Sequence, residues 1–213
     1  MSDYRITFSK TGSLAFISHL DFNHSFIRAL KRAGLPLKYS EGFNPRPKIS
    51  FGLPLSVGME GTNELVDVSL TEDIPCEKVK SALEKAMTGE MKILSVETPE
   101  KKLKFIKYAE YTVEFLDVEE GKAYDRDKIL AALSDPPPVM KRTKSGDKLT
   151  DIKPMIIAYD AEVSECSVRL FLTLTAYDSF FLNPDYVVKA LDAAGLDLPQ
   201  DYKITRTNII FED

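Results

Sequence analysis

Apolar and polar residues alternate with a period of two in several short segments of the chain, and they recur with a helical period in others. The alternating segments predict strands, which in the first half cover residues 4–9, 49–53, 65–70 and 91–96. Helical spacing and capping residues predict helices at about 19–33 and 75–87. This order of strand, helix, strand, strand, helix, strand is typical of a ferredoxin-like domain, in which two helices cover one face of an antiparallel sheet.

The first of these helices has clear start and stop signals. Ser18 is a good N-cap, Asp21 stands at the capping-box position three residues later, and Gly34 is placed to end the helix. Asn23 is the only polar residue on the apolar side, so we expect it to bond to a backbone group or to lie at the edge of the buried face. The opposite side carries polar and charged residues, namely Asp21, His24, Ser25, Arg28, Lys31 and Arg32.

The second half repeats this pattern after a polar, proline-containing stretch at 99–102 that we interpret as a domain boundary. Strands are expected over 111–116, 139–143, 156–163, 168–176 and 202–211. Asp125 and Asn183 are the expected N-caps of two helices, and residues 144–147 are expected to form a turn or the tip of a basic hairpin. The sequence therefore predicts an α+β protein of two tandem ferredoxin-like domains with antiparallel sheets, over 1–98 and 106–213.

Charge is distributed unevenly along the 213 residues, which are 44% apolar and carry a net charge of −5. Residues 28–48, the first basic segment, hold six cations against one acid. Residues 141–153, the second basic segment, hold five cations against two acids. Solubility needs only interspersed charge of either sign, so two basic segments in an acidic protein indicate an anionic partner.

The loop at 38–47 is rich in Gly, Asn and Pro, which predicts an ordered connection. Its phenol, amide, hydroxyl and cationic groups are of the kinds that hold phosphates and contact bases. We assign nucleic-acid contacts to Arg28, Lys31, Arg32, Tyr39, Ser40, Asn44, Arg46, Lys48, Arg142, Lys144, Lys148 and Lys153. A pseudo-symmetric tandem would bring both basic segments into one groove. Phe43 and Phe51 fit equally well as core residues or as loop anchors, and we give them no role.

Motifs for several other chemistries are missing from the sequence. It has no glycine-rich phosphate loop, no dinucleotide-binding fingerprint and no Cys/His cluster with metal spacing. Cys76 and Cys166 are too few for a disulfide framework, and without a signal peptide or an apolar run of membrane length we expect a cytoplasmic protein. His19 and His24 lie about 140° apart on a helix and cannot share a metal. We predict no metal site and no catalytic residue, and we keep His19, Asp21 and His24 as possible functional polar residues.

Three segments of the first half resemble a known family. Residues 16–21 (FISHLD), 28–36 (RALKRAGLP) and 39–51 (YSEGFNPRPKISF) are similar to the radical SAM-linked family of uncharacterised bacterial proteins, domain of unknown function 2344. The second half adds a basic-to-Asp motif, formed by Lys144, Gly146, Lys148, Asp151, Ile152, Lys153 and Pro154. The chain departs from the family at Asn23, where an apolar residue is usual, and at His24, where arginine is common.

The resemblance implies a companion of a radical SAM enzyme, with RNA as the substrate. This chain lacks the three closely spaced cysteines that an iron–sulfur cluster requires, so the cluster and SAM would belong to the partner. We therefore expect a non-catalytic accessory protein for RNA modification that presents structured RNA, tRNA or rRNA, to that enzyme. Two alternatives stay open. One is a docking module for the enzyme without RNA contact. The other is a metal-independent ribonuclease resembling CRISPR repeat-processing proteins, with His19 or His24 beside Arg28 as an acid/base pair.

Overall fold

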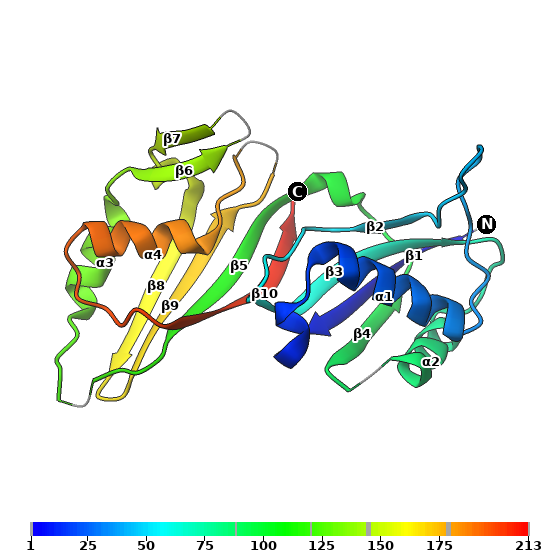
Figure 1. Ribbon diagram of the computed structural model, residues 1–213, viewed down its shortest axis with the longest axis horizontal. Coiled ribbons are helices and arrows are strands. Elements are labelled where there is room, and N and C mark those ends of the chain that lie inside the picture. Colours follow the sequence, from blue (N-terminus) through cyan, green and yellow to red (C-terminus); the bar gives the residue numbers. More distant parts are fainter. Residues whose placement is uncertain (1, 88, 120, 144–145, 178–179, 213) are drawn as a thin grey trace. The chain divides into compact units, whose positions relative to one another are not determined.

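A computed structural model describes residues 2–87, 89–119, 121–143, 146–177 and 180–212. The chain divides into two compact units, one formed by 1–106 with 211–213 and the other by 107–210. Within each unit, helices pack against an antiparallel sheet (Figure 1). The α+β class and the ferredoxin-like arrangement predicted from the sequence are thus confirmed.

The first unit has the strand order β4-β1-β3-β2, and each neighbouring pair is antiparallel. Its elements along the chain are β1 (Ser2–Lys10), the 3-10 helix η1 (Gly12–Phe16), α1 (His19–Arg32), β2 (Ile49–Phe51), β3 (Glu60–Leu70), α2 (Cys76–Ala86), β4 (Met91–Glu97) and the 3-10 helix η2 (Leu103–Phe105). α1 therefore starts from the central strand β1, and the loop after it leads to β2 at the end of this order.

Alternation along β1 separates the two faces of this sheet. Tyr4, Ile6 and Phe8 are buried against the helices, and the Phe8 ring lies 5.3 Å from that of Phe26 on α1. β3 begins at Glu60, five residues before the predicted start. Its first residues are largely polar or glycine and carry no hydrophobic alternation, yet they pair with the end of β1. β3 is thus longer than predicted because it pairs with β1 over residues whose side-chain pattern does not indicate a strand.

α1 begins where its capping residues predicted. The Ser18 Oγ accepts a hydrogen bond from the Asp21 amide at 3.1 Å and donates one to the Asp21 carboxylate at 2.7 Å. Gly34, two residues beyond the helix, has a φ of 70°, a conformation that suits glycine. Of the two expectations for Asn23, the structure supports a position at the edge of the buried face, because the residue is half-buried and its Oδ1 has no hydrogen-bond partner among the described residues.

The second unit has the strand order β10-β5-β9-β8, and β6 and β7 form a separate two-stranded sheet. Its elements are β5 (Ile106–Phe115), α3 (Arg126–Ser134), β6 (Val139–Thr143), β7 (Gly146–Thr150), the 3-10 helix η3 (Lys153–Met155), β8 (Ile156–Ser164), β9 (Ser167–Thr175), α4 (Pro184–Ala193) and β10 (Tyr202–Phe211). Asp125 and Asn183 cap α3 and α4 with their side chains, as expected. β6 and β7 pair as an antiparallel hairpin, in line with the expected basic hairpin. The bounds of β7 were not predicted, because a short, mostly exposed and charged strand shows little apolar alternation.

The β6–β7 hairpin is therefore an insertion between α3 and the main sheet, and β8 occupies the position of the second ferredoxin-like strand. In the part of the chain that the structure covers, no helix is both long and apolar enough to cross a membrane.

Candidate nucleic-acid-binding site

The cations of α1 lie on its exposed side near the C-terminal end. Arg28 is exposed and forms no hydrogen bond or ion pair with any described residue. The Lys31 ammonium lies 5.9 Å from the centroid of the Tyr39 ring, a cation–π distance that connects the helix to the following loop. Arg32 donates from Nη2 to the carbonyl oxygen of Ala86 on α2 at 2.9 Å. Arg28 and Lys31 are thus the α1 cations left to meet a ligand.

The loop after α1 is closed by its own hydrogen bonds. The Lys48 amide donates to the Lys38 carbonyl at 2.8 Å, and the Ser40 amide donates to the Arg46 carbonyl at 2.8 Å. The Arg46 amide returns a bond to the Ser40 hydroxyl at 3.0 Å. The Ser40 hydroxyl, assigned above to a ligand, thus also latches the loop, which is a narrow ribbon with its tip at residues 41–45.

The tip of this loop is exposed to solvent. Phe43 has a relative exposure of 111%, and Asn44 and Arg46 are also exposed. The other phenylalanine left without a role, Phe51, packs against the rings of Phe8, Phe22 and Phe26 at centroid distances of 6.3, 5.8 and 5.6 Å. Phe51 is thus a core residue, whereas Phe43 is not.

A groove of about 830 Å³ lies between α1 and α2. Arg32, Lys78 and Lys85 line it together with the acid Glu77. Sequence reasoning missed the two lysines because on α2 they alternate with acids and give no basic cluster along the chain. Only the packing of α2 beside α1 adds them to the basic surface.

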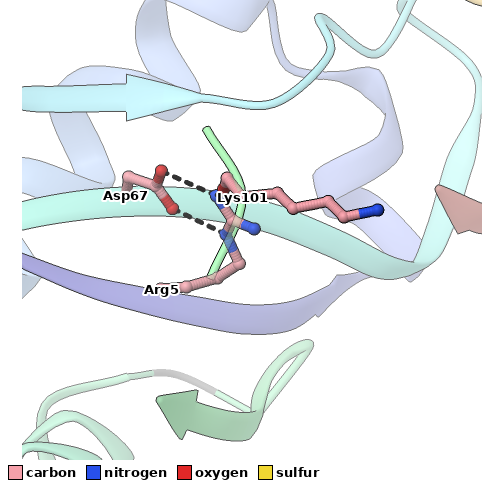
Figure 2. Close-up of polar contacts among 3 residues, drawn as sticks. All are labelled: Arg5, Asp67 and Lys101. Carbon is pink, nitrogen blue, oxygen red and sulfur yellow. Dashed lines mark hydrogen bonds and ion pairs between the residues drawn. The ribbon is translucent and has the colours of Figure 1, made fainter. Parts of the chain in front are cut away.

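A second cleft, of about 660 Å³, lies between β2 and the segment that follows β4. Lys48, Ser50 and Lys102 line it together with Asp67. Arg5 holds the Asp67 carboxylate through two hydrogen bonds, from Nε to Oδ1 at 2.8 Å and from Nη2 to Oδ2 at 2.9 Å. The same Nη2 donates to the Lys101 carbonyl at 2.7 Å. Figure 2 shows Arg5 and Asp67 pointing toward each other from β1 and β3, with the Lys101 side chain directed away. This pair fixes the segment after β4 to the sheet.

The polar residues at the start of α1 do not form one cluster. The His19 ring meets Phe51 edge to face at 5.4 Å, and burial, with a smaller contribution from the Lys10 charge, lowers the pKa of His19. Asp21 completes the helix cap, and His24 is exposed one turn before Arg28. Among the described residues, no three His, Cys, Asp or Glu side chains are arranged to hold a metal ion.

The second basic segment is built differently. Lys141 donates to the Phe181 carbonyl at 2.6 Å, and burial lowers the pKa of this lysine. Lys153 is ion-paired with Asp135 at 2.9 Å, which raises its pKa. Arg142 and Lys148 are exposed on β6 and β7, and Lys144 lies outside the described residues. Part of this segment's charge is thus used within the unit, and its union with the first segment in one groove stays a prediction.

Fold and surface together define an α+β protein of two ferredoxin-like units, with a basic surface on the first. A family model described as an uncharacterized protein conserved in bacteria (DUF2344) matches residues 3–184, and the chain belongs to that family. No sequence match was found among curated proteins.

One solved structure supports the fold. A chain in the crystal structure of a Cbf5–Nop10–Gar1 complex is 12% identical, with a TM-score of 0.53 over 99% of this chain and 50% of that chain. This chain therefore spans half the length of that relative. A crystallised protein from Galdieria sulphuraria is 15% identical over 96% of this chain and 98% of its own, with a TM-score of 0.28.

Proposed function

We propose that the protein binds structured RNA through the first basic segment, and that it serves as a non-catalytic recognition partner of a radical SAM enzyme. One observation carries the RNA proposal. The free cations Arg28 and Lys31 adjoin a latched loop that presents Tyr39, Phe43 and Arg46. The radical SAM partner rests on the family resemblance of the sequence.

The charges of this surface favour an RNA ligand. A cation engaged by a carboxylate offers little to a phosphate, but the side chains of Arg28 and Arg46 have no ion pair within the described chain. Phosphate contacts supply most of the affinity in such complexes, and aromatic side chains add stacking on unpaired bases. The Ser40 latch holds the loop in shape before binding, which lowers the entropic cost of ordering it.

Filter binding to total bacterial RNA across a salt series tests the proposal. Affinity should fall steeply as salt rises, because each neutralised phosphate releases a counterion. The double change Arg28→Gln and Arg46→Gln should weaken binding about tenfold or more. Lys92→Gln, which removes an exposed charge from β4 in the same unit, is the matched control and should leave affinity unchanged. Affinity that does not depend on salt would overturn the RNA proposal.

A docking role without RNA is the second candidate, and one observation favours it. Phe16, at the end of η1, and Leu20, in the first turn of α1, are 71% and 62% exposed, and such apolar side chains suit a protein partner. Co-purification with the radical SAM enzyme separates the candidates. A complex that survives nuclease treatment and is lost on Leu20→Ser supports docking through this pair. A complex lost on nuclease treatment supports an RNA bridge.

A further inference from the structure

The loop tip carries an aromatic side chain that nothing in its own fold uses. Phe43 is 111% exposed, and no aromatic ring or cation of the described residues lies against it. Gly42 before it has a φ of 126°, in the region that favours glycine, and Pro45 follows two residues later. The chain thus bends sharply at the tip and leaves Phe43 at its apex. The full exposure of this ring leaves its face open to a ligand.

The base of the loop keeps this apex in place. Two bonds between residues 40 and 46 and one between 38 and 48 close the ribbon below the tip. The Lys38 amide also donates to the Ser69 carbonyl on β3 at 2.9 Å, which fastens the ribbon to the sheet. In Figure 1 this loop, in light blue, projects beyond the end of β2. Phe43 is therefore held out by a supported loop.

The surroundings of Phe43 indicate what it contacts. The neighbouring tip residues Glu41, Asn44 and Arg46 are polar or charged, so the ring is a lone aromatic and not part of an apolar patch. Protein hot spots lie in the centre of well-packed interfaces, whereas stacking on a base needs only one flat face beside cations that hold the backbone. The amide of Asn44 and the guanidinium of Arg46 can bond base edges and phosphate.

We infer that Phe43 stacks on an unpaired base of the RNA, so that the protein selects single-stranded loops or bulges over continuous duplex. This inference rests on the proposed RNA-binding function and gives it a substrate class. Bases in a duplex are already stacked on both faces and are unavailable to the ring, whereas a base in a loop can be turned out onto it.

The test measures the affinity of the 213-residue chain for two RNA probes. One is a short hairpin with a mixed-sequence loop that contains the fluorescent base 2-aminopurine, and the other is a fully paired duplex of the same length. Phe43→Ala should weaken hairpin binding roughly 5- to 150-fold, abolish the change in 2-aminopurine fluorescence, and leave the salt dependence unchanged. Duplex binding should change less than twofold.

Two further variants make the result specific. Phe43→Tyr keeps an aromatic face and should retain hairpin binding, whereas Phe43→Leu is apolar but cannot stack and should lose it. Phe105→Ala removes another exposed phenylalanine of the same unit, 43% exposed, and should have no effect. Three results would overturn the inference while the RNA-binding function stands. They are unchanged hairpin affinity in Phe43→Ala, retained hairpin affinity in Phe43→Leu, and a loss of duplex affinity in Phe43→Ala that equals the loss for the hairpin. A protein that binds neither probe nor total RNA would overturn both.

Discussion

Removal of the Asp67 carboxylate should destabilise the first unit strongly. The Arg5 side chain is only 5% exposed and makes two charge-assisted hydrogen bonds to Asp67. In Asp67→Ala the guanidinium stays buried and keeps its hydrogen bond to the Lys101 carbonyl and its contact with the Phe211 ring, 4.8 Å away. Breaking a buried pair on one side costs about 3–5 kcal/mol. Because the Asp67 side chain is 22% exposed, water recovers part of this, and we expect about 3 kcal/mol.

Native-state hydrogen exchange of β1 and β3 amides is the suitable assay, because it reports on the first unit by itself. A loss of about 3 kcal/mol makes opening of these strands more than about a hundredfold more frequent. The control is Glu114→Ala, read on the β5 and β9 amides of the second unit, which breaks an ion pair to Arg169 at 2.9 Å with both side chains 40% exposed or more. That change should cost less than about 1 kcal/mol.

The double variant Arg5→Met with Asp67→Leu completes the test. If the loss in Asp67→Ala comes from the stranded guanidinium, replacing both partners by apolar residues should restore a large part of the stability. A destabilisation by Asp67→Ala that is no larger than that of Glu114→Ala would refute the reasoning, because it would mean that solvent reaches Arg5 freely.

Three other predictions concern α1 and the basic segments. The pKa of His19 lies below its usual 6.5, so just below that pH the unfolded chain binds more protons than the folded one. The free energy of unfolding should therefore fall as pH drops through this window. His19→Gln should remove this part of the pH dependence, measured by urea unfolding. Asn23→Leu should stabilise α1 by about 1 kcal/mol in urea unfolding, because it removes a buried oxygen that has no hydrogen-bond partner among the described residues. Charge reversal at Arg46 and at Lys144 should each weaken RNA binding in filter assays. If both residues contact one ligand, the loss of binding free energy in the double variant should be smaller than the sum of the two single losses, whereas full additivity would contradict a shared groove.

Local signals explain the parts of the fold that the sequence predicted well. The start of α1 follows from Ser18 and Asp21, which act within one turn of each other. β7 pairs with the adjacent β6, in the region where a basic hairpin was expected, but its own residues show little apolar alternation. The separation of this hairpin from the main sheet depends on the pairing of β5 with β9, far along the chain, so no local pattern revealed it.

The candidate site was predictable to a similar degree. The exposed cation Arg28 followed from helical periodicity. Whether a cation is free depends on tertiary contacts such as those of Lys141 with Phe181 and of Lys153 with Asp135. The two phenylalanines Phe43 and Phe51 were indistinguishable in sequence, because solvent exposure is set by the loop's anchoring bonds and not by residue type.

The salt dependence of RNA affinity in an α1 variant tests the central claim most directly. Arg28→Gln with Lys31→Gln removes two cations whose side chains face solvent or the Tyr39 ring and leaves the sheet untouched. If both contact phosphates, the slope of log affinity against log salt should become shallower by about 1.4 to 1.8, at 0.7 to 0.9 per contact. The same slope in the double variant as in the wild type and in Lys92→Gln would contradict RNA binding at this surface.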